Sequence, residues 1–191
     1  MVRLKQDYLV DVNLRVILPI AVRAPDYFRP GNEQWARYIQ LDWPRRAEFL
    51  GLPHVWPDPD PIVQDLETLK VAADQPYIFW LSKMAVEAQR RGRGPEFTYH
   101  VSRSIFGGTK NWNAPENLGT AVKAAGLDLA ELESAIASGN HLEEIDSNQI
   151  ALEKSGHWGV PTFVFRGEPF FGQDRVDLLR WRLTKEGIAK R

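Results

Sequence analysis

The stretch Gly156–Leu183, GHWGVPTFVFRGEPFFGQDRVDLLRWRL, decides the fold of this chain. Thr162–Arg166 is rich in β-branched and aromatic residues, which favour strands. Arg166-Gly167-Glu168 is typical of a tight hairpin turn, and Glu168–Phe171 predicts the partner strand. Gly172 then breaks the strand pattern. A dense hairpin is therefore expected close to the end of the chain.

The hairpin is followed by a predicted helix, which begins at Asp174 and carries apolar residues such as Leu179 and Leu183 on one face. Much earlier in the chain, Asp11–Ile17 alternates polar and apolar residues, which predicts a further strand. Leu4–Val10 before it has the pattern of the last turns of a helix. Separated strands with a terminal ββα unit indicate an α/β protein with a mixed sheet packed against helices.

A mostly helical block occupies the middle of the chain, from about Gln34 to Ser155, and Pro44 is expected to interrupt its first helix. A proline-rich loop between Pro53 and Pro61 is extended or rich in turns, because a residue before proline avoids the helical region. After this loop we expect helices over Ile62–Ala73, Tyr77–Arg91, Phe97–Phe106, Pro115–Ala125, a short segment capped by Asp128, and His141–Lys154.

Composition narrows the possible functions. The chain has 191 residues and a net charge of −1, which argues against bulk electrostatic capture of nucleic acid or of an anionic membrane. No apolar stretch approaches the ~20 residues of a membrane span. There is no cysteine, so disulfides and a cysteine nucleophile are excluded within this sequence. The four histidines lack metal-ligand spacing, so no metal site is predicted, and a cytoplasmic location is expected.

The segment Gly159–Arg175, GVPTFVFRGEPFFGQDR, resembles the C-terminal signature of the 2-hydroxychromene-2-carboxylate isomerases. These proteins group with kappa-class glutathione transferases and DsbA-like proteins in the thioredoxin superfamily. VDVNLRVILP and AVKAAGLD, which begin at Val10 and Ala121, are similar to further parts of that family. The resemblance implies a thioredoxin-like fold of the DsbA and kappa type, in which residues 1–30 and 156–191 form the thioredoxin-like domain and residues 31–155 form a large inserted all-helical domain.

The resemblance also implies that glutathione is the cofactor. The Val160–Pro161 bond is then expected to be cis, with the N–H and C=O of Val160 free to pair with the cysteinyl unit as one more short strand. Gln173 and Asp174 would receive the γ-glutamyl end, whose carboxylate suits exposed helix N–H groups and whose ammonium suits the Asp174 carboxylate. The alternative for Asp174 is that it only caps the last helix.

The activity that the resemblance implies is isomerisation of an unsaturated aromatic-derived acid by reversible thiol addition, or glutathione transfer of the kappa type. Trp158 and Trp112 are the candidates for lining a pocket for such an aromatic-derived small-molecule substrate. The alternative for each is a role in the hydrophobic core, which is the commoner place for such a residue, and Trp158 is the better pocket candidate because it lies two residues before Val160. The resemblance further implies a homodimer.

The sequence departs from the family pattern at its front. Family members begin with a strand that carries a Phe-Asp-x-x-Ser-Pro-Tyr-like motif, whose serine activates the glutathione sulfur. No serine precedes Ser82 here, so we expect that first strand and the catalytic serine to be missing from the sequence, and no catalytic residue is assigned. The alternative to an enzyme is a non-catalytic thioredoxin-like module that binds a glutathione-like peptide.

Overall fold

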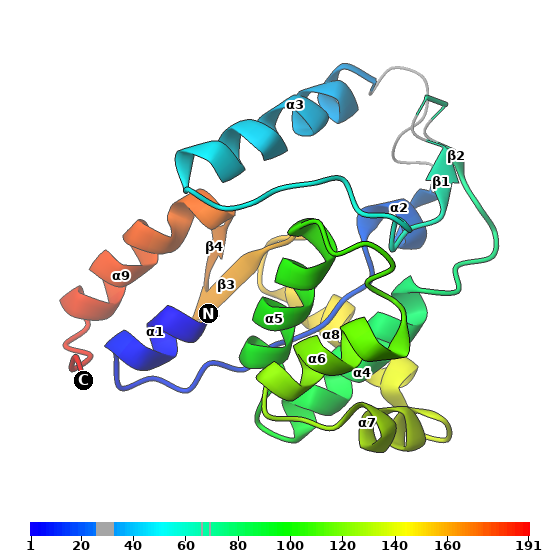
Figure 1. Ribbon diagram of the computed structural model, residues 1–191. Helices are drawn as coiled ribbons and strands as arrows, with labels where there is room; N and C mark the ends of the chain where they lie inside the picture. The colour runs from blue at the N-terminus through cyan, green and yellow to red at the C-terminus, as the bar shows by residue number, and fades with distance from the viewer. Residues whose placement is uncertain (26–32, 66, 69) are drawn as a thin grey trace.

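The elements of the fold come from a computed structural model, which describes residues 1–25, 33–65, 67–68 and 70–191 (Figure 1). The described helices are α1 (Val2–Asp7), α2 (Ile20–Arg23), α3 (Glu33–Phe49), α4 (Ile78–Arg90), α5 (Gly94–Phe106), α6 (Pro115–Ala124), α7 (Leu129–Ile136), α8 (His141–Lys154), the short 3-10 helix η2 (Gln173–Arg175) and α9 (Val176–Lys185). The strands are β1 (Gln64–Asp65), β2 (Lys70–Val71), β3 (Thr162–Phe165) and β4 (Glu168–Phe171).

The terminal ββα unit predicted from the sequence is confirmed. Strands β3 and β4 pair antiparallel, and Phe165 opposes Glu168 at the closed end of the hairpin. The two loop residues, Arg166 and Gly167, have φ values of 50° and 85°. Positive φ at both loop positions is the geometry that matches the twist of a two-residue hairpin. The chain then passes through η2 into α9.

The predicted strand over Asp11–Ile17 is wrong. The segment forms no ladder with any described strand, since β3 and β4 pair only with each other. Side chains of two helices supply its hydrogen bonds instead: the Leu14 N–H donates to Oε1 of Gln89 at 2.8 Å, and the Val16 carbonyl accepts from Nδ2 of Asn148 at 3.1 Å. Alternation predicts an extended segment with two faces, but a strand also needs a backbone partner.

The predicted helix over Ile62–Ala73 is also wrong where the structure describes it. This region holds the small antiparallel pair β1 and β2, in which Gln64 opposes Val71. The buried Gln75 side chain holds the start of this pair in place. Its amide accepts from the Val63 N–H at 3.0 Å and donates to the Val63 carbonyl at 2.8 Å. Spacing alone does not separate helix from strand in so short an apolar run.

Other predicted helix boundaries hold with small shifts. Helix α3 continues through Pro44 to Phe49, although Pro44 was expected to interrupt it. The predicted cap at Asp128 is confirmed, because its side chain accepts a hydrogen bond from the Glu131 N–H at 3.0 Å. The last helix begins at Val176 rather than at Asp174.

Two hydrophobic cores form within the described residues. The larger lies among helices α4 to α7, which pack side by side in Figure 1. The smaller brings the two ends of the chain together: α1 packs against β4 and α9, and the Leu9 N–H donates to the Ala189 carbonyl at 2.9 Å. The predicted domain boundary between residues 30 and 31 lies outside the described residues. No described helix has both the length and the apolar character to cross a membrane.

Candidate functional site

The turn before β3 places the backbone of Val160 at the surface. The Val160–Pro161 peptide bond is cis, the conformation expected from the sequence. The residues on either side of Val160 make local hydrogen bonds: the Gly159 N–H donates to Nδ1 of His157 at 2.9 Å, and the Thr162 hydroxyl donates to the Gly159 carbonyl at 2.6 Å. These bonds hold the turn in one shape while Val160 itself is 51% exposed.

Val160 keeps its own backbone groups available. Within the described part of the chain, neither its N–H nor its C=O takes part in a hydrogen bond. Pro161, the next residue, accepts a hydrogen bond from the Gly172 N–H at 2.9 Å. That bond fixes the turn against the residue that immediately precedes Gln173 and Asp174. The structure therefore brings together the four residues that the sequence predicted for glutathione binding.

Asp174 does not cap the last helix, so the alternative left open by the sequence is wrong. The N-cap of α9 is Arg175 and the N-cap of η2 is Gly172, and neither helix start has a side-chain cap. The Asp174 carboxylate instead forms an ion pair with Arg175, at 3.2 Å between Oδ2 and NH1, and both side chains are more than half exposed. An exposed pair of this kind contributes little to stability, which leaves Asp174 available to a ligand.

Gly172 shapes the approach to Asp174. Its φ of 105° is a conformation that residues with side chains rarely adopt, and a Cβ atom at this position would clash with Oδ1 of Asp174. We expect Gly172→Ala to lower the free energy of unfolding by about 1–2 kcal/mol and to displace the Asp174 carboxylate. Urea denaturation of the purified variant measures the first effect.

The control for this prediction is Gly119→Ala in α6, where an added Cβ meets only Leu129 Cδ2, at 3.8 Å. A helix interior favours alanine over glycine, so this variant should be as stable as the parent or more stable. Equal stability of the two variants would contradict the role given to Gly172.

A pocket of about 360 Å³ opens beside these residues. Gln173 and Asp174 form one side, and residues from the C-terminal part of α3 form the other: Asp42, Arg45, Arg46 and Phe49. In Figure 1 this end of α3 lies next to the start of α9. Sequence reasoning missed the contribution of α3, because only the folded chain brings that helix to η2.

The two predicted pocket tryptophans lie in different environments. Trp158 is 45% exposed and stacks with His157, whose ring in turn stacks on Phe171 with 4.0 Å between ring centroids. It therefore lies on the surface beside the Val160 turn. Trp112 is fully buried in the helical core and donates its Nε1–H to the Pro59 carbonyl at 2.7 Å. The structure does not bring Trp112 to the other candidate residues.

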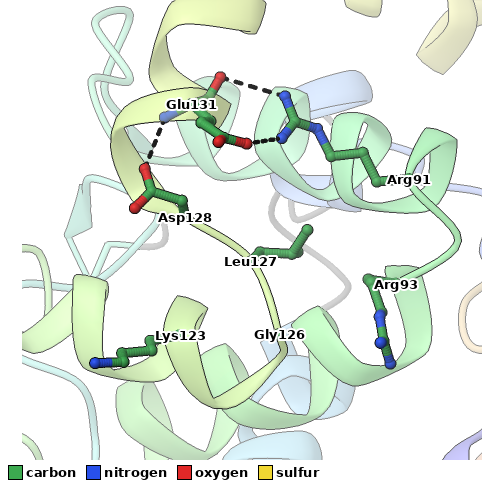
Figure 2. A pocket seen from close by; sticks show the side chains of 7 residues that line it. All are labelled: Arg91, Arg93, Lys123, Gly126, Leu127, Asp128 and Glu131. Carbon is green, nitrogen blue, oxygen red and sulfur yellow. Dashed lines mark hydrogen bonds and ion pairs between the residues drawn. The ribbon is translucent and has the colours of Figure 1, made fainter.

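A second pocket, of about 500 Å³, lies in the helical part of the molecule (Figure 2). Its charged lining is largely committed to the structure. Arg91 donates to Oε2 of Glu131 at 2.6 Å and to Oε1 of Glu87 at 2.9 Å, while Asp128 caps α7. None of the residues predicted for ligand binding lines this pocket, so we place the candidate site at the Val160 turn.

A ββα unit that follows a large helical part is typical of thioredoxin-like proteins of the DsbA architecture. Residues 31–184 match the DSBA-like thioredoxin domain family. The chain belongs to this family.

Among solved structures, that of a 2-hydroxychromene-2-carboxylate isomerase is similar in fold, with a TM-score of 0.56 and 18% sequence identity, over 88% of this chain and 77% of that one. No curated protein matches the sequence.

In the described residues, no group of three or more histidine, aspartate or glutamate side chains is placed to hold a metal ion.

Proposed function

We propose that the chain is a glutathione-dependent isomerase of the 2-hydroxychromene-2-carboxylate isomerase type, or a glutathione transferase of the kappa type, located in the cytoplasm. One observation carries the proposal. The unpaired backbone of Val160 and the exposed carboxylate of Asp174 are held close together by the hydrogen bond from Gly172 to Pro161. Glutathione is an extended peptide with a cationic and an anionic group at its γ-glutamyl end. Its backbone can pair with Val160, and its cationic group can bind the Asp174 carboxylate.

In this proposal the Val160 N–H and C=O pair with the cysteinyl unit of glutathione as an added strand. Asp174 binds the γ-glutamyl ammonium, with Gln173 beside it. The half-exposed ring of Trp158 supplies an apolar surface next to the cysteinyl position for an aromatic-derived substrate.

Glutathione, when bound through Val160 and Asp174, would supply a thiolate that can add reversibly to a conjugated double bond, so that this bond could rotate while it is single. The protein contributes by orienting the two reactants, which saves the entropy of bringing them together.

A second candidate function is glutathione-peptide binding without catalysis. It is favoured by one observation: Ser82, the first serine of the sequence, is buried in α4. The two functions separate in an assay of glutathione-dependent isomerisation of an aromatic unsaturated acid, followed by absorbance. Binding of glutathione with no thiol-dependent turnover indicates the binding module.

The binding step is tested with Asp174→Asn. We expect this variant to bind glutathione more weakly by about 1–3 kcal/mol, the range for a hydrogen bond to a charged group. Calorimetric titration with glutathione and S-methylglutathione measures the loss, and both ligands should be affected alike because the γ-glutamyl end is common to them. Thermal unfolding should change little, since Asp174 caps no helix.

Asp177→Asn is the matched control for this test, because Asp177 is an exposed acidic residue in the first turn of α9. It should bind glutathione as the parent chain does. Unchanged affinity in Asp174→Asn, or the same loss in both variants, would contradict the role of Asp174.

The homodimer remains part of the proposal and is checked by the molar mass from light scattering at micromolar concentration.

A further inference from the structure

Two arginines line the pocket between α3 and η2. One of them, Arg46, has no ion-pair partner among the described residues. Its Nε is shielded from solvent and makes no hydrogen bond within them. The neighbouring Arg45 differs, because its NH1 donates to Oδ1 of Asp42 at 3.3 Å. A shielded donor on a charged group is costly to leave without an acceptor. An anion that accepted a hydrogen bond from the Arg46 guanidinium would therefore bind favourably.

The opposite side of the pocket carries the complementary charge. Among the residues that the structure describes, Asp174 pairs only with Arg175, and both side chains are more than half exposed. A surface pair of this kind exchanges readily for a ligand cation, because it contributes little by itself. The pocket thus presents one exchangeable carboxylate and one unpaired guanidinium across a space of about 360 Å³.

The headgroup of an α-amino acid carries an ammonium and a carboxylate on one carbon. It can therefore bind the Asp174 carboxylate and the Arg46 guanidinium at the same time. The helix that follows Gly172 offers little help with the carboxylate. Its first segment, η2, has only three residues, so few aligned peptide dipoles meet there. A formal positive charge is needed, and a guanidinium binds a carboxylate through two parallel hydrogen bonds.

Phe49 restricts the position of that guanidinium. The Cζ of Arg46 lies 5.2 Å from the centroid of the Phe49 ring, one turn further along α3. Such a contact orders the planar group before a ligand arrives. We propose that Arg46 is a specificity-determining residue that binds the α-carboxylate of the ligand, while Asp174 binds the α-ammonium. In its choice of ligand, the γ-glutamyl end of glutathione, the inference rests on the proposed function.

Three dipeptide-like probes test the two charges separately. γ-Glutamylglycine carries both groups, 4-aminobutyrylglycine lacks only the α-carboxylate, and glutarylglycine lacks only the α-ammonium. Binding is followed by chemical-shift changes in NMR titrations of the full chain. We expect the parent chain to bind γ-glutamylglycine about tenfold or more tightly than either truncated probe, which corresponds to one charged hydrogen bond lost.

Arg46→Gln should weaken binding of γ-glutamylglycine about tenfold and leave binding of 4-aminobutyrylglycine unchanged, because that probe has no carboxylate to lose. Asp174→Asn should give the converse pattern with glutarylglycine. Arg37→Gln is the matched control: it removes the same charge from an exposed residue of α3 that does not line the pocket, and it should alter each affinity less than about twofold. Equal losses in Arg46→Gln and Arg37→Gln would reduce the effect to general electrostatics and overturn the inference.

The inference and the proposed function fail in different ways. Glutathione binding that depends on Asp174 but not on Arg46 overturns the inference alone. Binding of γ-glutamylglycine that depends on Arg46, with no binding of glutathione, overturns the proposed function alone. If the folded parent chain shows no shift with either ligand at millimolar concentration, both are wrong.

Discussion

Trp112→Ala is expected to lower the free energy of unfolding by about 3–5 kcal/mol, as is typical when a large buried aromatic side chain is removed. Trp112 has no exposed surface and lies in the core formed by α4 to α7. Its ring meets Tyr77 edge to face, with 5.8 Å between centroids, and its Nε1–H satisfies the Pro59 carbonyl at 2.7 Å. The variant loses apolar burial, an aromatic contact and a hydrogen bond together.

Urea denaturation followed by circular dichroism measures this loss, and Trp181→Ala is the matched control. Trp181 is 51% exposed on α9, where it contacts Arg182 and Lys185 through its ring face. Its removal should cost less than about 1 kcal/mol. Comparable, small losses in both variants would mean that Trp112 is not the core residue described above.

Trp112 also shows where sequence reasoning reaches its limit. From the sequence, Trp112 and Trp158 are both candidates for a substrate pocket, and Trp158 is the better one because it lies two residues before Val160. The structure separates them by burial: Trp158 remains 45% exposed beside the Val160 turn, whereas Trp112 is enclosed. Burial depends on which helices close around a residue, and no local pattern contains that information.

The hairpin was predictable because its causes are local. Strand-forming residues flank Arg166 and Gly167, and a glycine suits the left-handed conformation that a two-residue loop requires. The segment Asp11–Ile17 has an equally clear alternation but makes its hydrogen bonds to the side chains of Gln89 and Asn148. Whether an extended segment becomes a strand is decided by a partner elsewhere in the chain, which alternation does not reveal.

The candidate site divides in the same way. Val160 and Asp174 were predictable, since they lie within one continuous motif. Arg46 was not, because its relation to Asp174 arises from the packing of α3 beside η2. On the sequence, Arg45 and Arg46 are two adjacent cations of equal standing. The structure distinguishes them, because Arg45 pairs with Asp42, whereas the shielded Nε of Arg46 has no partner among the described residues.

The second large effect on stability is expected at Glu87, a residue of α4 with 13% of its side chain exposed. Its two carboxylate oxygens are both engaged. Oε1 accepts from Nε of Arg91 at 2.9 Å, and Oε2 lies 3.1 Å from Nε2 of His141, which begins α8. Since Arg91 also binds Glu131 on α7, one carboxylate links three helices.

These contacts set the direction of the Glu87 pKa. Burial by itself favours the neutral acid and would raise the pKa. The hydrogen bonds from Arg91 and His141, together with the positive charge of Arg91, outweigh burial and hold the pKa of Glu87 below its ordinary value. The unfolded chain therefore takes up this proton at a higher pH than the folded chain. The stabilisation that the charged form provides is complete above the unfolded pKa of about 4.3 and is lost as the pH falls through the lower folded pKa.

Glu87→Gln is accordingly expected to lower the free energy of unfolding by about 2–3 kcal/mol at pH 7, because the uncharged amide leaves Arg91 and the buried His141 without their carboxylate. The difference between parent and variant should shrink below about pH 4.3, as the parent protonates Glu87. Urea midpoints at pH 7 and below about pH 4.3 measure it. Glu131→Gln removes the more exposed partner of the same Arg91, and it should cost no more than about 1 kcal/mol. Parallel pH profiles for the parent and Glu87→Gln would show that Glu87 is not the ionised centre of this network.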